Sequence, residues 1–206
     1  MKSKNLMVFV CIALIGLAGC ARYQAKSLNK IDTSIFSLSQ NSQEKFVSFS
    51  YHIFDTDDCM KYLDRNVIAK GYQPIQITIT NNTNRYLNIS MSNFSLPYVS
   101  SEEVAKRVHT STVKRSVGYG ILGLFIWPFL VPAIVDGIGS SEANRKLDAD
   151  FAKKTLKDKI LRPYSTINGL IFVPVKKFKK DFTFTIVDEE NHERFVLGAT
   201  NHKIKI

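Results

Sequence analysis

One short segment of the chain combines residue types that bind metals or carry out acid–base chemistry: His52, Asp55, Asp57, Asp58 and Cys59. A calcium loop of the EF-hand type would need a glycine and a distal glutamate, and a zinc site would need a second Cys or His pair. Neither set is present, whereas the acids suit the start of a short helix, where backbone N–H groups lack partners. We therefore expect helix capping here and no metal site.

No other group of side chains indicates catalysis. The remaining histidines, His109, His192 and His202, are far apart in the sequence. The chain has no Gly-x-Ser-x-Gly, His-Glu-x-x-His or Gly-x-x-x-x-Gly-Lys motif, so a nucleophile elbow, a zinc protease site and a phosphate loop are not indicated. We predict no catalytic residues, no cofactor and no enzymatic function. An active site assembled from distant loops is the alternative.

The N-terminus indicates export from the cytoplasm. Lys2 and Lys4 precede an uncharged apolar stretch of 13 residues, Leu6 to Ala18. A membrane-spanning helix needs roughly 20 such residues, so this shorter stretch is typical of a secretory signal peptide. We expect residues 1–19 to be removed from the mature protein.

The signal ends in Leu17-Ala18-Gly19-Cys20, which resembles the lipobox of bacterial lipoproteins. The alternative is an ordinary secretory signal with a chance cysteine. The resemblance implies that Cys20 becomes the N-terminus and carries a thioether-linked diacylglyceryl, usually with a third acyl chain. Two or more chains hold a protein stably on a membrane. We expect a protein anchored in the cell membrane or outer membrane, facing the periplasm or cell surface; Ala21, where an aspartate would retain it at the inner membrane, favours the outer membrane.

Charge and composition fit an exported globular protein. The 206 residues have a formal charge of +10, and removal of residues 1–19 takes away two lysines and no acid, which leaves +8. Apolar residues make up 45% of the chain, which excludes disorder over its whole length. Cys59 is the one unmodified cysteine of the mature chain, and we expect it to be a small buried hydrophobe rather than a reactive thiol. Export argues against nucleic acid as a partner.

Alternating apolar and polar residues predict a mainly β fold. Residues 20–43 are rich in Ser, Asn, Gln and Lys and are expected to form a flexible tether after the lipidated cysteine. Alternation or apolar runs then predict strands, and the short segment Cys59 to Leu63 predicts a helix. The strands are expected at residues 46–54, 75–80, 86–91, 167–175, 182–187 and 193–197.

These strands predict an antiparallel β-sandwich of about six or seven strands, with residues 44–101 and 162–206 as its two parts. The segment Pro74 to Thr83 also resembles the strand-turn signature of small immunoglobulin-like domains on bacterial envelope proteins. The resemblance implies a sandwich of that type.

Residues 102–161 interrupt the strand pattern. The uncharged run from Ser116 to Val135 has 20 residues, enough to span a membrane if helical. Pro128 and Pro132 near its centre favour a reversal of the chain, since proline breaks helix interiors. A span would also separate the two strand sets. Helical spacing returns from Ser141 to Leu161, with an apolar stripe at Ala143, Leu147, Phe151 and Ile160. We therefore predict a helical hairpin with an apolar tip.

The tip residues Phe125, Ile126, Trp127, Phe129 and Leu130 are predicted to contact the bilayer or an apolar groove of an envelope protein. The alternative is that they pack on the protein's own sandwich. The sequence thus favours a structural or interaction protein of the cell envelope, with membrane lipid as one partner. The second hypothesis is a periplasmic ligand-binding module whose hairpin covers an apolar pocket.

A basic cluster, Lys176, Lys177, Lys179 and Lys180, lies between two predicted strands. It is either a solvated turn or a contact with the phosphates of anionic lipid or lipopolysaccharide.

Overall fold

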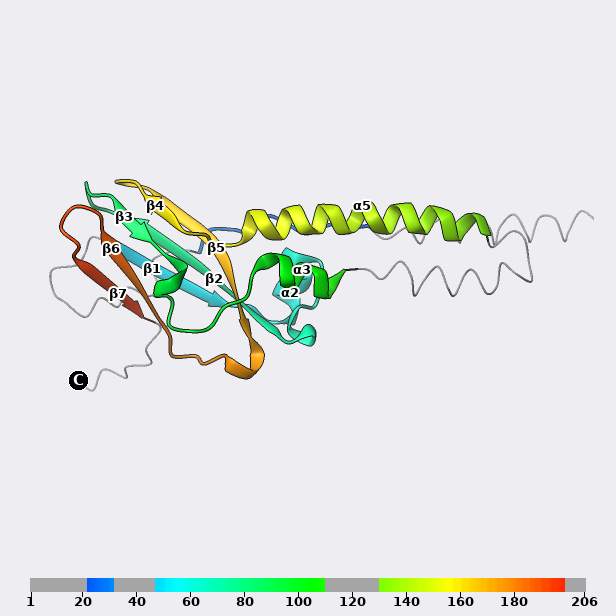
Figure 1. Ribbon diagram of the computed structural model, residues 1–206, viewed down its shortest axis with the longest axis horizontal. Helices are drawn as coiled ribbons and strands as arrows, with labels where there is room; N and C mark the ends of the chain where they lie inside the picture. The colour runs from blue at the N-terminus through cyan, green and yellow to red at the C-terminus, as the bar shows by residue number, and fades with distance from the viewer. Residues whose placement is uncertain (1–21, 32–46, 110–129, 199–206) are drawn as a thin grey trace, which may run out of the picture. The chain divides into compact units, whose positions relative to one another are not determined.

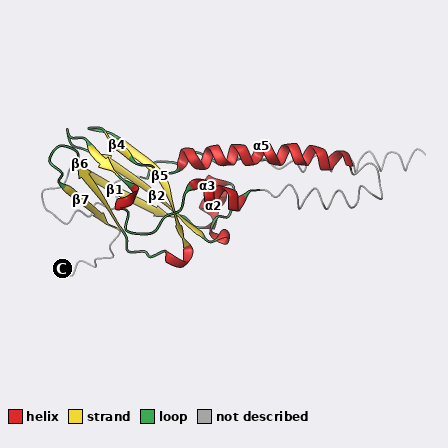
Figure 2. Cartoon of the chain, in the orientation of Figure 1, coloured by secondary structure: helices red, strands yellow, loops and turns green. Residues whose placement is uncertain are grey.

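The computed structural model describes residues 22–31, 47–109 and 130–198 (Figures 1 and 2). The chain divides into two units. The sandwich unit consists of Ala25–Val108 and Phe151–Ile206, and the helical unit consists of Met1–Gln24 and His109–Asp150. The signal peptide, Cys20 and the predicted tip residues 125–129 lie outside the described residues.

Two antiparallel sheets form the sandwich unit. The first sheet has the order β1 (Val47–Ile53), β2 (Tyr72–Asn81) and β5 (Thr166–Pro174). The second has the order β4 (Lys159–Leu161), β3 (Leu87–Ile89), β6 (Thr183–Asp188) and β7 (Arg194–Gly198). The described residues therefore form seven strands, and the predicted mainly β, antiparallel sandwich is confirmed.

Strands from both sides of the predicted insertion pair with each other. β2 pairs with β5 from Tyr72 opposite Pro174 to Thr80 opposite Thr166, and β3 pairs with both β4 and β6. The two strand sets thus belong to one sandwich, as the argument for a chain reversal requires. Among the helices in the described part of the chain, none is both long and apolar enough to cross a membrane.

The core lies between the two sheets. Ile75, Ile77 and Ile79 of β2 are fully buried at alternate positions, as their spacing predicts. Burial of each such side chain contributes roughly 1.5–3 kcal/mol relative to exposure. From the second sheet and its loops, the same cluster includes Leu87, Ile89, Leu161, Phe182, Phe184, Ile186, Phe195 and Leu197.

The outer face of the first sheet is also covered. Phe172 of β5 stacks on Phe151, with ring centroids 5.7 Å apart and planes at 6°. Nearby, the Gln76 and Asn168 amides both donate hydrogen bonds to the main-chain oxygen of Asn29. Alternation alone places the polar side chains of this sheet toward solvent. Three of them, Ser50, Gln76 and Thr78, are nevertheless buried. Within the predicted tether, Asn29 therefore contacts the sheet.

The described residues contain three α-helices: α2 (Thr56–Leu63), α3 (Ser101–Val108) and α5 (Leu130–Lys154). Short 3₁₀ helices occur at Ile68–Lys70, Met91–Asn93 and Val175–Lys177. Within the sandwich unit, α2 and α3 lie at one end of the strands and the β6–β7 turn lies at the other (Figure 1). We call these the helical end and the distal end.

The second helical segment ends earlier than its pattern predicts. Helix α5 stops at Lys154, not Leu161, and Lys159–Leu161 is strand β4. The reason is that Leu156 N donates to Leu170 O at 2.9 Å, which attaches the chain to the edge of β5. Ile160 consequently lies half-exposed on β4, while Ala143, Leu147 and Phe151 form the buried stripe of α5.

Gly169 on β5 lies directly under this crossing and provides a test of it. A Cβ added there would lie 3.0 Å from N and 3.1 Å from Cα of Leu156. Because backbone atoms must move to relieve this contact, we expect Gly169→Ala to lower the free energy of unfolding by about 1–3 kcal/mol. Urea denaturation measures the change. Thr166→Ser on the same strand should stay within about 0.5 kcal/mol of the wild type, and a Gly169→Ala variant of wild-type stability would contradict the close approach.

Candidate functional site

The predicted contact residues lie at the edge of what the structure describes. Cys20, Phe125, Ile126, Trp127 and Phe129 are outside the described residues, and Leu130 is the first residue of α5. The structure does describe the chain segments on either side of these residues. Their contacts show where each segment is attached.

The insertion between β3 and β4 begins and ends on the same strand. Val99 N donates to Phe172 O at 2.8 Å, and Leu156 N donates to Leu170 O at 2.9 Å. The two acceptors are two residues apart on β5, which is roughly 7 Å along a strand. The chain between Val99 and Leu156 must therefore leave the sandwich unit and return to almost the same point.

The peptide that follows Cys20 reaches the same region. Three hydrogen bonds mark it: Lys26 N to Lys61 O at 3.0 Å, Lys154 Nζ to Tyr62 O at 2.6 Å and Tyr72 OH to Glu103 Oε1 at 2.9 Å. The first two link the N-terminal segment and the end of α5 to α2, and the third links α3 to the start of β2. All three passages out of the sandwich unit are thus at its helical end.

Inside the helical unit, two segments are bound to α5. Tyr23 OH donates a hydrogen bond to the carboxylate of Asp150. His109 Nε2 lies 2.6 Å from Asp148 Oδ1. Tyr23 is three residues after Cys20, and His109 is the last described residue before the segment 110–129. Tyr23 and His109 therefore both contact the same turn of α5.

The His52–Cys59 segment forms a helix cap, as predicted. Asp58 N donates to Asp55 Oδ1 at 2.8 Å, and Asp55 N donates to Asp58 Oδ2 at 3.3 Å, so the two acids form a capping box at α2. His52 Nε2 lies 2.7 Å from Asp58 Oδ2. In the part of the chain that the structure describes, no group of three or more His, Cys, Asp or Glu side chains is placed to hold a metal ion.

Cys59 is fully buried on α2, as expected of a small hydrophobe. Burial raises the pKa of its thiol to about 11. The thiolate is the reactive form, so at neutral pH the buried Cys59 has little nucleophilic character.

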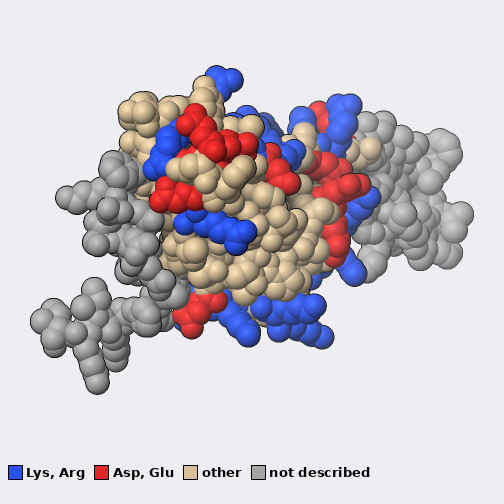
Figure 3. All heavy atoms as spheres, turned by 60° about the vertical axis from the view of Figure 1, so that its left-hand side comes forward, with Lys and Arg blue, Asp and Glu red and all other residues tan. Residues whose placement is uncertain are grey.

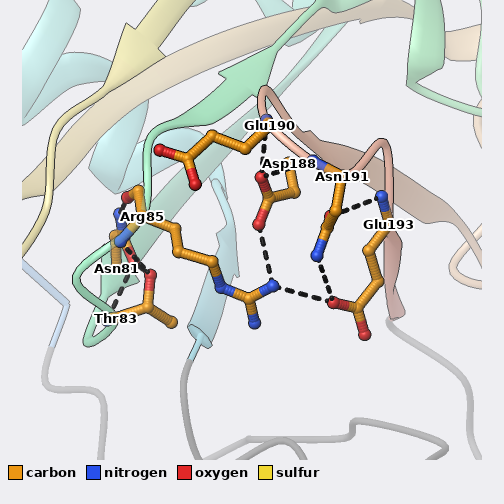
Figure 4. A network of polar contacts seen from close by, with 7 residues as sticks. All are labelled: Asn81, Thr83, Arg85, Asp188, Glu190, Asn191 and Glu193. Atoms are coloured by element: carbon orange, nitrogen blue, oxygen red, sulfur yellow. Dashed lines mark hydrogen bonds and ion pairs between the residues drawn. The ribbon is translucent and has the colours of Figure 1, made fainter.

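A polar network at the distal end joins two turns of the sandwich (Figure 4). Arg85 Nη1 lies 2.9 Å from Asp188 Oδ2, an ion pair, and donates to Glu193 Oε2 at 2.9 Å. Asp188 is fully buried, and its Oδ1 accepts from Glu190 N at 2.8 Å. The hydrogen bond to Glu193 and the charge of Asp188 raise the pKa of Arg85. These contacts make the network a structural tie between the β2–β3 and β6–β7 turns.

No local pattern in the sequence predicts this network, because Arg85 and Asp188 are 103 residues apart. The turns themselves have local signals in the Asn and Asp residues of 81–84 and 188–191, which favour turns. The one available signal was an arginine in the first turn and a group of acids, Asp188 to Glu193, in the second.

Two open hollows flank the segment Thr155–Asp158. One, of about 550 Å³, is bordered by polar and basic side chains that include Lys153, Lys157 and Lys159. The other, of about 380 Å³, is more apolar, and its walls include Met91, Tyr98, Ile171 and Phe172. The second hollow could accept a small apolar group.

Comparison with known proteins adds no family to these observations. No protein-family model matches the chain, and no curated protein matches it at a significant level of similarity.

The distal network gives a stability prediction. Replacing Arg85 with Ala leaves the buried Asp188 carboxylate without its counter-charge, so we expect the free energy of unfolding to fall by about 2–4 kcal/mol. Glu193→Gln removes only a half-exposed partner and should cost less than about 1 kcal/mol. Urea denaturation at neutral pH compares the two variants. A loss no larger for Arg85→Ala than for Glu193→Gln would show that the buried pair does not stabilise the turns.

Proposed function

We propose that the protein is a lipid-anchored lipoprotein of the cell envelope with a structural or interaction role. Its insertion is a helical hairpin whose apolar tip contacts the bilayer or an envelope partner. The observation that carries this proposal is the attachment of both ends of the insertion to neighbouring residues of β5, Phe172 and Leu170. Fixed, adjacent ends favour an out-and-back path for the apolar run.

The N-terminal contacts support a lipid close to this hairpin. Three extended residues reach roughly 10 Å, so a lipid on Cys20 would begin within that distance of the Tyr23 backbone. Tyr23 is bound to Asp150 of α5. Lipid and hairpin would then act on the same membrane rather than on two separate surfaces.

The length of α5 fits such an arrangement. From Asp150 to Leu130 the helix rises by roughly 30 Å. Its charged residues lie between Asp136 and Lys154, whereas residues 130–135 are uncharged. A polar stem would therefore precede an apolar end, as expected for a helix that crosses the headgroup layer only at its tip.

The strand order supports the resemblance to immunoglobulin-like domains. In their lettering, the first sheet has the order A-B-E and the second the order C′-C-F-G, with the insertion between C and C′. Such sandwiches commonly present loops and edges to other proteins. This strand order is compatible with an interaction role, but it does not identify a partner.

The second candidate function is a periplasmic ligand-binding module. The apolar hollow beside Tyr98 and Phe172 favours it, since about 380 Å³ lies within the usual range of small-molecule sites. In this alternative the hairpin covers the ligand, and its apolar tip does not contact lipid.

The lipid anchor has a direct test. Cys20→Ala removes the thiol that would accept the diacylglyceryl group, so labelled palmitate should enter the wild-type protein and not the variant. Cys59→Ala serves as the matched cysteine control and should keep the label. Equal labelling of wild type and Cys20→Ala would refute the lipoprotein proposal.

The tip is tested with the mature chain carrying Cys20→Ala, which lacks the lipid. We expect Phe125→Asp, Phe129→Asp and Leu130→Asp together to abolish binding to neutral phosphatidylcholine vesicles, because each side chain contributes roughly 1.5–3 kcal/mol when buried. The melting temperature should stay unchanged if the tip contacts lipid.

The control for the tip replaces three apolar residues exposed on the sandwich, Tyr86, Tyr164 and Val196, with Asp. This variant should bind vesicles like its parent. A collapsed melting temperature in the tip variant, with no vesicle binding by the parent, would show that the tip packs on the protein.

A further inference from the structure

The loop between β5 and β6, residues 175–181, has a strong positive charge. It contains Lys176, Lys177, Lys179 and Lys180 against the single acid Asp181, and we call it the basic loop. All four lysines are exposed. Phe178 is partly buried against the inter-sheet core and anchors the loop, which keeps the lysines on its outer side.

The basic loop lies at the helical end of the sandwich. Val175 N donates to Gly71 O at 2.9 Å, and Tyr72 N donates to Val67 O at 3.2 Å. Gly71 and Val67 belong to the segment just after α2, and α2 also holds the N-terminal peptide through Lys61 O and Lys26 N. The basic loop and the peptide that leads to Cys20 therefore share one end of the sandwich.

The charges of α2, the segment after it and α3 nearly cancel. Residues 54–71 contain four acids and three basic residues, and α3 contains two of each. Most of these acids have partners: Asp55 and Asp58 cap α2, Asp64 pairs with Arg65, and Glu102 pairs with Lys106. The excess positive charge at the helical end thus comes mainly from the basic loop, together with Lys26 and Lys154 of the chain segments bound to α2.

The distal end has a mixed charge. Its β6–β7 turn contains four acids, Asp188, Glu189, Glu190 and Glu193, and two of them share the single guanidinium of Arg85. Figure 3, in which this end comes forward, shows acidic side chains gathered beside basic ones on its surface. The helical end therefore has the larger excess of positive charge. At the distal end the four acids are nearly balanced by Arg85, Arg162 and Arg194.

We infer that the basic loop binds the phosphate groups of anionic lipids in the membrane that holds the protein, with the helical end toward the membrane. The orientation rests on the proposed lipid at Cys20; the binding itself does not. Anionic headgroups attract lysines close to the surface, and the attraction falls off within a Debye length. Exposed Val175 beside the lysines adds an apolar contact with the headgroup region.

The test uses the mature chain with Cys20→Ala and two kinds of vesicle. One is pure phosphatidylcholine, and the other contains about 30% phosphatidylglycerol, which supplies the negative surface potential that attracts lysines. The increase in binding from the first to the second isolates the electrostatic contribution. A tip that inserts contributes to binding to both kinds of vesicle. Failure of the tip proposal would therefore lower binding to neutral vesicles, whereas failure of this inference would remove only the increase on anionic vesicles.

Lys176, Lys177, Lys179 and Lys180 are replaced together by Gln. We expect the anionic increment in binding to fall by roughly several hundred-fold, since each of the four lysines near the surface strengthens binding about five-fold. High salt should abolish the increment of the parent chain. The matched control replaces Lys30, Lys157, Lys159 and Arg162 by Gln. These residues are also exposed, and the variant should keep most of the increment.

Equal losses in the two quadruple variants would overturn the inference, because net charge rather than the basic loop would then control binding. An unchanged increment in the loop variant would overturn it as well. Release by inorganic phosphate at constant ionic strength would indicate a discrete anion site instead of a lipid surface. Circular dichroism confirms that each variant remains folded.

Discussion

The edge of β5 is the constraint on which the rest of the molecule depends. On one side this strand pairs with β2 from Tyr72 to Thr80 and so joins the two halves of the sequence. On its other side it binds Val99 and Leu156, the two ends of the insertion. An edge strand with free N–H and C=O groups tends to pair with other chains. Here the ends of the insertion occupy part of that edge, and they also fix where the insertion leaves and returns.

The same constraint explains why the first sheet is buried on both faces. Once Leu156 is attached to β5, the last turn of α5 lies over the sheet, and Phe151 stacks on Phe172. Farther along the face, Gln76 and Asn168 have amide groups that need partners away from water. The main-chain oxygen of Asn29 accepts from both. An N-terminal peptide that composition alone describes as a tether thus gains contacts from the polar side of the sheet.

Patterns in the sequence correctly predicted those features that depend on interactions between neighbouring residues. The alternation of Ile75, Ile77 and Ile79 predicted β2, and Asp55 to Asp58 predicted a helix cap, because both depend on neighbouring residues. The end of α5 was predicted seven residues too late, since a helical stripe continues to Ile160 and only pairing with β3 and β5 overrides it. Tertiary contacts also decide the burial of Ser50 and the Arg85–Asp188 pair, and no spacing in the sequence reports them. The lipid anchor and the tip remain predictions from the sequence.

The proposed role of the basic loop depends on its position relative to the N-terminal peptide that leads to the proposed lipid. In an isolated sequence, Lys176 to Lys180 is an ordinary solvated turn between strands. In the structure, the bond from Val175 to Gly71 places it beside the segment after α2, while Lys61 of α2 holds the N-terminal peptide. Attraction between lysines and anionic headgroups acts only within roughly 10 Å, so it matters only for a surface already held near the membrane. A short peptide from Cys20 to Lys26 would supply that proximity, whereas the distal end has no comparable excess of positive charge.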